Sequence, residues 1–321
     1  MHYDVFNGDA DGIIALVQLR LNDPKKSQLI TGVKRDIELV KRVEAGKAFS
    51  VTVLDISMEK NHTALVNLLA NNVPVFYADH HRAGDIPQST FLEAHIDLDA
   101  NTCTSLIVNH YLSGKYAKWA VAAAYGDNMI IAAEQLADEI ALSVMEREQL
   151  KQLGIYVNYN GYGATEEDLH FPPAELFNLL VKYEDPLALI SDKSSVFWLL
   201  KAAYETDMTL ADSAQELIND EICKIISLPD QPWSRRVSGV IGNELANQSP
   251  SKAHAVITEN EDGSYRVSLR APLVNKQGAD KICVKYDTGG GRAAAAGINY
   301  LPANKLQCFI RDVHEYYGKQ A

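Results

Sequence analysis

The sequence predicts a two-domain α/β protein whose first domain is built on a parallel sheet. Its 321 residues exceed the ~100–150 residues of one typical hydrophobic core, so two domains are expected. Over roughly the first 130 residues, short apolar runs alternate with helical patterns, which is typical of a parallel sheet covered by helices. Strand-like segments after residue 235 predict a second, smaller domain.

The residue patterns of the first domain predict strands that alternate with helices. Strands are expected at 3–6, 50–54 and 73–78, and helices at 13–21, 36–45, 59–69 and 132–153. The Gly/Asn/Tyr-rich stretch 156–165 predicts a loop, and 173–182, 196–204 and 210–226 look helical. Strands at 253–258 and 265–269 flank a predicted hairpin turn.

The domain boundaries follow from this pattern. Pro229 and Pro232, followed by Ser-Arg-Arg, predict a boundary near residue 235. We therefore expect a first domain at 1–195, a helical linker at 196–235 and a second domain at 236–321.

Composition narrows the class of protein. A hydrophobic fraction of 47% with 22% charged residues is ordinary for a folded soluble chain. The sequence has neither a run of ~18 apolar residues nor a signal-like N-terminus, so we expect a cytoplasmic protein without membrane contact. The four cysteines lack C-x-x-C spacing, which argues against a zinc cluster or a disulfide framework and favours reduced, buried thiols.

Charge bears on the kind of ligand. The net charge of −12 disfavours binding to long duplex DNA, which requires Lys and Arg against phosphates. Residues 236–321 carry 11 basic and 8 acidic side chains, net +3, whereas residues 1–235 carry −15. An acidic lobe suits cations and a mildly basic lobe suits a short anionic substrate, although chance variation of surface charge explains the same numbers equally well.

Polar side chains follow the predicted strands. Asp9 and Asp11 follow the first, Asp55 the second, and Asp79-His80-His81 the third. Ligands of open parallel sheets bind beyond the carboxyl ends of the strands. Asp127 follows the small-residue run 120–124, which we count as a fourth strand end. The set predicts one divalent-metal site.

Each cluster alone has a simpler explanation. Asp9 and Asp11, two residues apart, can face one cation, but an Asp-Gly capping turn looks the same. Asp55 could bridge two ions or cap the following helix. Carboxylate with imidazole in Asp79-His80-His81 suits Mn²⁺, whereas adjacent histidines also occur on solvated loops. Their common position at strand ends favours the metal site.

The motifs resemble those of the DHH/DHHA1 phosphoesterases, the superfamily of nanoRNases and RecJ-like enzymes. The carrying residues are Gly8-Asp9-Ala10-Asp11-Gly12, Asp55, Asp79-His80-His81, Gly126-Asp127, and the run Gly289–Gly297 preceded by Ser268-Leu269-Arg270. The resemblance implies a parallel-sheet DHH domain joined by helices to a smaller α/β DHHA1 domain, with the active site in the cleft between them. It spans nearly the whole chain.

The resemblance also implies residue roles. It implies two Mn²⁺ ions, with Mg²⁺ as the alternative, bound by Asp9, Asp11, Asp55, His80 and Asp127, with Asp55 bridging. The catalytic set would be His81, Asp55 and Asp79: His81 would face the scissile phosphate and Asp79 would orient the neighbouring histidine. Arg270, Gly289, Gly290, Gly291 and Arg292 would hold the substrate, since glycine permits a close phosphate approach.

Two positions depart from the family pattern. Val5 stands where many members that act on short oligonucleotides have a histidine, so one metal ion lacks a ligand that Asn7 or water would have to replace. Arg292 stands where a histidine usually follows the glycines. An arginine there can pair with a phosphate in bidentate fashion, or it simply begins a helix and points to solvent.

The leading hypothesis is a two-metal phosphoric diester hydrolase acting on short oligonucleotides or linear dinucleotides, such as pGpG-type dimers, and releasing nucleoside 5′-monophosphates. The first alternative is a RecJ-type single-strand-specific 5′–3′ exonuclease, and a pyrophosphatase is disfavoured because that branch lacks the Gly-rich run. The non-enzymatic alternative is a nucleotide-binding regulatory module. The sequence leaves the base and sugar preference open, and a homo-oligomer as well.

Overall fold

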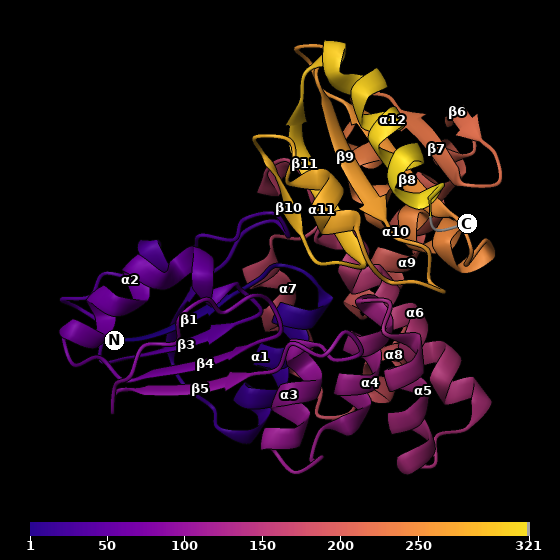
Figure 1. Cartoon of the computed structure of the whole chain (residues 1–321). Coiled ribbons are helices and arrows are strands. Elements are labelled where there is room, and N and C mark those ends of the chain that lie inside the picture. The colour runs from indigo at the N-terminus through magenta and orange to yellow at the C-terminus, as the bar shows by residue number, and fades with distance from the viewer. Residues whose placement is uncertain (320–321) are drawn as a thin grey trace. The chain divides into compact units, whose positions relative to one another are not determined.

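The computed structural model describes residues 1–319 and divides into two compact units, Met1–Ala203 and Tyr204–Ala321 (Figure 1). The division falls inside the long helix α9 (Val196–Ala211), whereas the expected boundary near residue 235 lies within α10 (Pro232–Gln248). Each unit has a sheet of its own.

The first unit contains the predicted parallel sheet. Its strands are β1 (His2–Phe6), β2 (Ser27–Ile30), β3 (Ser50–Leu54), β4 (Val75–Asp79) and β5 (Leu92–Ile96), in the order β2-β1-β3-β4-β5. All neighbours are parallel, with His2 opposite both Ser27 and Ser50. The predicted α/β class is therefore confirmed, and the chain adds the short strands β2 and β5, which were not predicted.

Helices cover both faces of this sheet. Strands β2 and β3 lie on opposite sides of β1, and right-handed crossovers place α1 (Ala10–Asn22) and α2 (Met58–Ala70) on opposite faces of the sheet (Figure 1). Tyr3 and Val5 of β1 join the core on the α2 side. Phe6 packs toward Phe177, with ring centroids 6.0 Å apart.

The remainder of the first unit is helical. Its helices are α3 (Thr104–Tyr111), α4 (Ala117–Gly126), α5 (Ile130–Glu139), α6 (Val144–Asn160), α7 (Pro173–Leu180) and α8 (Pro186–Ser191), with the 3-10 turn η2 (Glu166–Asp168) between α6 and α7. Helices α4 and α6 approach closely because glycines face each other. A Cβ on Gly154 would lie 1.9 Å from the Ala122 carbonyl oxygen, and one on Gly126 would lie 2.7 Å from the Gly154 carbonyl oxygen. This contact fixes the position of the C-terminus of α4, and Asp127 is the next residue.

A buried charge cluster anchors β1 to α1. Asp4, fully buried, accepts hydrogen bonds from Arg20 on both carboxylate oxygens and from the Ser27 hydroxyl at 2.6 Å. Arg20 also donates to the Thr52 hydroxyl at 3.0 Å, and His2 lies 3.0 Å from Asp4. Burial alone would raise the pKa of Asp4, but the hydrogen bonds from Arg20 and His2 and the charge of Arg20 hold it well below its usual value.

The second unit contains a six-stranded mixed sheet in the order β10-β11-β9-β8-β7-β6. The strands are β6 (Gln215–Asn219), β7 (Cys223–Leu228), β8 (Ala253–Glu259), β9 (Tyr265–Arg270), β10 (Gly289–Gly291) and β11 (Ala295–Leu301). The predicted hairpin is confirmed as β8 and β9, and β7 with β8 is the parallel pair.

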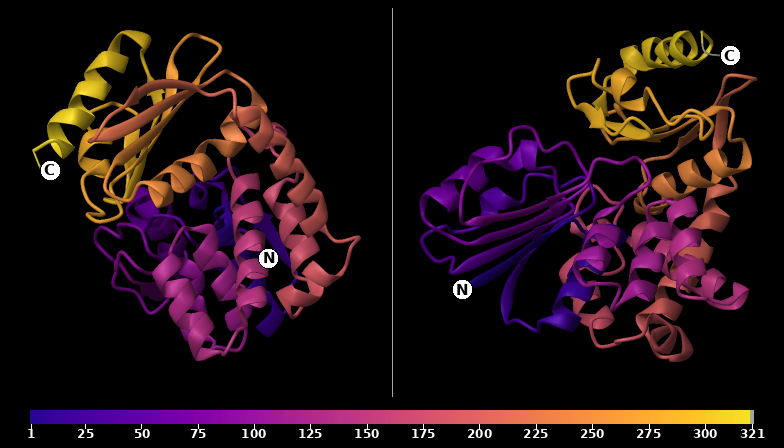
Figure 2. Two further views of the ribbon diagram at one scale, coloured as in Figure 1. Left: turned by 90° about the vertical axis from the view of Figure 1, so that its right-hand side faces the viewer. Right: turned by 60° about the horizontal axis from the view of Figure 1, so that its bottom comes forward.

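Alternation along β8 gives this sheet two covered faces. Ala253, Ala255 and Ile257 join a core built with α11 (Ala279–Cys283) and α12 (Leu306–Tyr317), while α10 packs against β8 and β9. Figure 2 shows α12, in yellow, lying along one face of the sheet. The short turn η3 (Ala303–Lys305) leads into α12.

Several local predictions were wrong. Residues 36–45 form only the 3-10 turn η1 (Val40–Arg42), and the helix expected at 132–153 is two helices, α5 and α6. The loop expected at 156–165 is partly helical, because α6 continues to Asn160. Residues 210–226, assigned to a helical linker, contain β6 and β7, whose apolar side chains Ile225 and Cys223 enter the core of the second sheet.

Two predictions from composition can be compared with the structure. Cys103, Cys223 and Cys283 are buried, as expected, and Cys308 is half-buried. Among residues 1–319, no helix is both long and apolar enough to span a bilayer.

Candidate metal centre

The polar clusters of the first unit meet where the strand order reverses. The chain runs outward from β1 to β2 on one side and continues from β3 to β4 on the other, so the switch point of the sheet lies between β1 and β3. Asp9 follows β1, Asp55 follows β3, and Asp79 ends β4, with His80 and His81 directly after it. Open parallel sheets bind their ligands at this kind of position.

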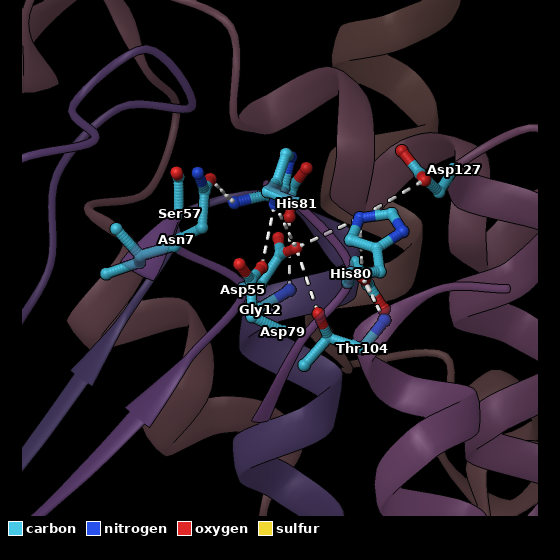
Figure 3. A network of polar contacts seen from close by, with 12 residues as sticks. Asn7, Gly12, Asp55, Ser57, Asp79, His80, His81, Thr104 and Asp127 are labelled. Carbon is cyan, nitrogen blue, oxygen red and sulfur yellow. Dashed lines mark hydrogen bonds and ion pairs between the residues drawn. The ribbon is translucent and has the colours of Figure 1, made fainter. Parts of the chain in front are cut away.

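His80 points its ring at the carboxylates. Nδ1 lies 2.8 Å from the Thr102 carbonyl oxygen, which can only accept, so Nδ1 carries the proton when the ring is neutral. Nε2 is then a lone-pair donor, 3.3 Å from Asp55 Oδ1, 3.7 Å from Asp11 Oδ2 and 4.0 Å from Asp127 Oδ2. Figure 3 shows the His80 ring between Asp55 and Asp127. A hydrogen bond on the far nitrogen is how proteins orient a metal-binding histidine.

Asp11 is held by the start of α3. Its oxygens accept the backbone N–H groups of Thr104 and Ser105, both at 2.7 Å, and the Ser105 hydroxyl donates to the Asp11 carbonyl oxygen at 2.8 Å. Burial, followed by the charges of Asp127 and Asp9, nevertheless raises the pKa of Asp11 to about 6. The cluster therefore holds more negative charge than its own hydrogen bonds balance.

Asp55 adopts a left-handed backbone, with φ of 59°. Such strain in a residue other than glycine is typical of functional sites. The Thr104 hydroxyl donates to Asp55 Oδ1 at 3.1 Å, and burial together with the charges of Asp9 and Asp11 raises the pKa of Asp55 well above its usual value. Ser57, not Asp55, caps α2, so the capping alternative for Asp55 is wrong.

Asp79 and His81 form a separate pair. Asp79 is fully buried, and its Oδ1 lies 2.7 Å from His81 Nδ1. The His81 side chain is 31% exposed and also lies 3.8 Å from Asp55 Oδ1. The carboxylate thus fixes the orientation of a ring that reaches the edge of the cluster, and the histidine that Asp79 orients is His81.

Asp127 does not follow a strand, contrary to the prediction. It is the C-cap residue of α4, in which every residue from Trp119 to Gly126 is buried. Asp127 therefore joins the cluster from a helix and not from a strand. Its Oδ2 faces His80, and its Oδ1 lies 3.6 Å from the Lys34 ammonium.

Asp9 has a double attachment. Its Oδ1 accepts the Gly12 N–H at 3.1 Å, so the predicted capping turn is present at the start of α1. Its Oδ2 accepts a hydrogen bond from Lys34. Burial would raise the pKa of Asp9, but the charge of Lys34 lowers it. Burial would likewise lower the pKa of Lys34, but the charges of Asp9, Tyr162 and Asp127 raise it above its usual value.

The donor set fits a divalent cation. Ligand atoms of Asp11, His80 and Asp127 lie within 4.8 Å of one another, as do those of Asp55, His80 and His81. Carboxylate oxygens with one neutral imidazole suit Mn²⁺, and a dication would balance the charge that raises the pKa of Asp11 and Asp55. The amide of Asn7 is not placed for such a role, since Oδ1 accepts the Asp9 N–H and Nδ2 donates to the Lys34 carbonyl oxygen.

Sequence reasoning missed the groups that orient these ligands. They are Lys34, Thr102, Thr104 and Ser105. The polar run that leads into the apolar positions of α3 could have identified Thr104 and Ser105 as the start of a helix. Lys34, in the loop after β2, carries no comparable signal.

The residues predicted to hold the substrate lie in the second unit. Arg270 ends β9 and is turned toward α10, where Nε donates to Asn243 Oδ1 at 2.7 Å and Nη2 to the Gly239 carbonyl oxygen at 3.2 Å. Arg292, half-buried, follows β10. Its backbone N–H donates to the Ala295 carbonyl oxygen at 2.8 Å.

The three glycines form β10, paired with β11. Packing explains two of them: a Cβ on Gly289 would lie 1.8 Å from the Cys283 carbonyl oxygen, and one on Gly291 would lie 2.5 Å from Ala296 Cα. Gly290 alone faces open space.

Comparisons with known proteins agree with this fold. Residues 221–319 match the family described as the DHHA1 domain. A search of curated protein sequences gave no match. A manganese-bound exonuclease RecJ aligns with TM-score 0.60 and 16% identity over 99% of this chain and 90% of that one. RecJ from Thermus thermophilus in complex with Mn²⁺ gives 0.60 and 17% over 99% of this chain, which spans only 52% of that protein.

A third structure matches end to end. The pGpG-specific phosphodiesterase PggH from Vibrio cholerae aligns with TM-score 0.56 and 12% identity over 100% of both chains. At these identities the likeness is one of fold. A five-stranded parallel sheet carrying the Asp-His-His motif, followed by a DHHA1 domain, defines the two-domain DHH/DHHA1 architecture. The family match over residues 221–319 and the fold of the whole chain together support the resemblance to the DHH/DHHA1 phosphoesterases.

Proposed function

We propose that the chain is a Mn²⁺-dependent phosphodiesterase that hydrolyses short oligonucleotides or linear dinucleotides to nucleoside 5′-monophosphates, with Mg²⁺ as the alternative cofactor. The observation that carries the metal-dependent chemistry is the orientation of His80, whose Nδ1 is bound by the Thr102 carbonyl oxygen while Nε2 faces Asp11, Asp55 and Asp127.

Each side chain then has a distinct task. A divalent ion, held by Asp11, Asp55, His80 and Asp127, would acidify a bound water and neutralise charge on the phosphate. Thr104 keeps Asp55 oriented through its hydroxyl. His81, aligned by Asp79, is the partly exposed group that would contact the scissile phosphate.

Charge and fold support a short substrate. The net charge of +3 on residues 236–321 suits a small anion, whereas the total of −12 opposes binding along a polymer. The end-to-end likeness to PggH is in keeping with this substrate class. In the second unit, Arg270, Arg292 and the backbone of Gly289, Gly290 and Gly291 are the proposed phosphate or base contacts.

The likeness to RecJ favours one other candidate, a single-strand 5′–3′ exonuclease. A substrate panel separates the two. It runs from a dinucleotide to a strand of about 24 nucleotides, longer than the ~4–16 nucleotides that one single-strand-binding module covers, in DNA and RNA with Mn²⁺. Rates that fall steeply with length support the proposal, and flat or rising rates favour the exonuclease.

The metal-dependent chemistry itself is tested by His80→Ala. Loss of a ligand should reduce mononucleotide release at least ~10²-fold, above the 10–100-fold typical of losing a group that only supports a ligand. His110→Ala, which removes an exposed histidine at the end of α3, is the matched control and should retain full activity. If the wild-type protein releases no mononucleotide from any substrate with Mn²⁺, the chain is not this enzyme and the regulatory alternative gains support.

A further inference from the structure

Lys34 lies on the side of the carboxylate cluster that has few metal-binding side chains. Its ammonium donates to Asp9 Oδ2, donates to Asn158 Oδ1 at 3.3 Å and lies 3.6 Å from Asp127 Oδ1. The same group lies 5.4 Å from the centroid of the Tyr162 ring. One lysine thus contacts two acidic side chains that the sequence assigned to metal ions.

The backbone of Lys34 is fixed on both sides. Its N–H donates to the Gly161 carbonyl oxygen at 2.8 Å, just past α6, and its carbonyl oxygen accepts the Asn7 amide at 3.1 Å, just past β1. The side chain is 24% exposed. These contacts hold Lys34 at the cluster, whereas the side chain of a surface lysine is free to move in solvent.

The cluster is divided into two sides. His80 Nε2 faces Asp11 Oδ2, Asp55 Oδ1 and Asp127 Oδ2, whereas Lys34 faces Asp9 Oδ2 and Asp127 Oδ1. Asp127 therefore points one oxygen to each side. The first side combines three carboxylates with an oriented imidazole, which is enough for one ion with water completing its shell.

The second side is poor in metal ligands. Both oxygens of Asp9 are engaged, one by the Gly12 N–H and the other by Lys34. Val5 is fully buried in the apolar core on the α2 side, and the Asn7 amide is used by backbone groups. A dication placed against the Lys34 ammonium would also meet direct charge repulsion.

We propose that the Lys34 ammonium takes the place of the second divalent ion, so that the centre binds one Mn²⁺ per chain, on the His80 side. This inference rests on the proposed metal-dependent function and revises its expected stoichiometry from two ions to one. A fixed monovalent cation beside Asp9 and Asp127 then supplies the positive charge that a second ion would bring to a bound phosphate.

The test is a count of bound ions on the full-length protein, stripped with EDTA and titrated with Mn²⁺. Calorimetry and elemental analysis give the stoichiometry, and electron paramagnetic resonance reports whether two ions lie within the ~3.5–4 Å of a two-metal site, since such a pair is magnetically coupled. The wild-type protein should bind one ion and give an uncoupled signal.

Lys34→Met should raise the stoichiometry from one ion to two and introduce the coupled signal. Lys41→Met, which removes an exposed lysine paired with Glu38 in the same segment, is the matched control and should stay at one. If Lys34→Met does not fold, as judged by circular dichroism, Lys34→Gln replaces it. The number of ions bound by the wild-type protein still tests the proposed stoichiometry.

The outcomes are distinguishable. Two coupled ions in the wild-type protein overturn the inference and leave the proposed function standing. One ion in the wild-type protein and in the folded Lys34 variant overturns the role of Lys34 in excluding the second ion. No bound ion in the wild-type protein overturns the metal-dependent function itself, and the inference with it.

Discussion

Replacing Asp4 by asparagine tests how strongly the buried charge pair at the root of β1 supports the first unit. Asp4 is fully buried and Arg20 is 7% exposed, so neither charge is solvated. Asparagine has one oxygen, so it can accept from one side of the Arg20 fork and must turn its NH₂ toward the other. We expect a loss of about 3–5 kcal/mol in unfolding free energy, the usual cost of leaving a buried charge without its partner.

The pH dependence has a definite sign. The pKa of Asp4 is depressed in the folded protein, so its stabilisation is fully present above the unfolded value of about 3.9 and is lost as pH falls through the folded value. The difference between wild type and Asp4→Asn should therefore be constant at neutral pH and shrink in acid below about pH 4.

Urea denaturation in EDTA, followed by circular dichroism across this pH range, measures the effect. Asp23→Asn is the matched control, because Asp23 pairs with Lys25 at an exposed position, with 59% of its side chain accessible, and should change stability by less than about 1 kcal/mol. The double variant Asp4→Asn/Arg20→Met should lose less than the two single changes together. A loss in Asp4→Asn no larger than that in Asp23→Asn, or a difference that persists unchanged in strong acid, would show that the Asp4 charge does not stabilise the first unit.

The packing and the metal centre give four further predictions. Gly154→Ala should cost about 1–3 kcal/mol by denaturation, because its Cβ would lie 1.9 Å from the Ala122 carbonyl oxygen, whereas Gly46→Ala, with open space around it, should be neutral. Mn²⁺ at about 100 times its Kd should stabilise the wild-type protein by about 2.7 kcal/mol in thermal melts, and EDTA should remove the effect. Asp55→Asn should abolish this stabilisation by Mn²⁺, and asparagine tolerates the left-handed backbone at that position. Undiminished stabilisation would exclude Asp55 as a ligand. Thr104→Val should weaken Mn²⁺ binding about 10–100-fold in calorimetry through the lost hydroxyl contact to Asp55, and unchanged affinity would contradict this.

The fold class could be predicted because strands and helices of the first unit differ in period and length. The strand at 50–54 was predicted to the residue, and α2 to within one residue at each end. The helix α4 was not recognised, because every residue from Trp119 to Gly126 is buried, and a helix without a polar face has no 3.6-residue pattern. Its short run of small apolar residues looked like a strand.

The second sheet shows the opposite failure. Residues 215–228 carry apolar positions at spacings that also suit a helix face, so the segment looked helical. The edge strand β6 is partly exposed and has few apolar residues of its own to reveal a period of two. Pairing with β7, and of β7 with β8, decides its conformation, and such pairing is a tertiary property.

The chemical groups available to the centre, and their order along the chain, could be predicted from the sequence. Asp9, Asp55 and the Asp79-His80-His81 motif lie at the ends of their strands because parallel strands deliver their carboxyl ends to one edge. How these groups are oriented and paired depends on tertiary contacts. Thr102 selects the nitrogen of His80 that faces the carboxylates.

Long-range partners settled the remainder. The N-terminus of α3 binds Asp11 across 93 residues, and Lys34 meets Asp9 across 25. Spacing along the chain does not predict these contacts, because the segments come together only when the helices pack on the sheet. The candidate residues of the site could therefore be named from the sequence, whereas their charge balance, and with it the number of ions we propose the site to bind, could not.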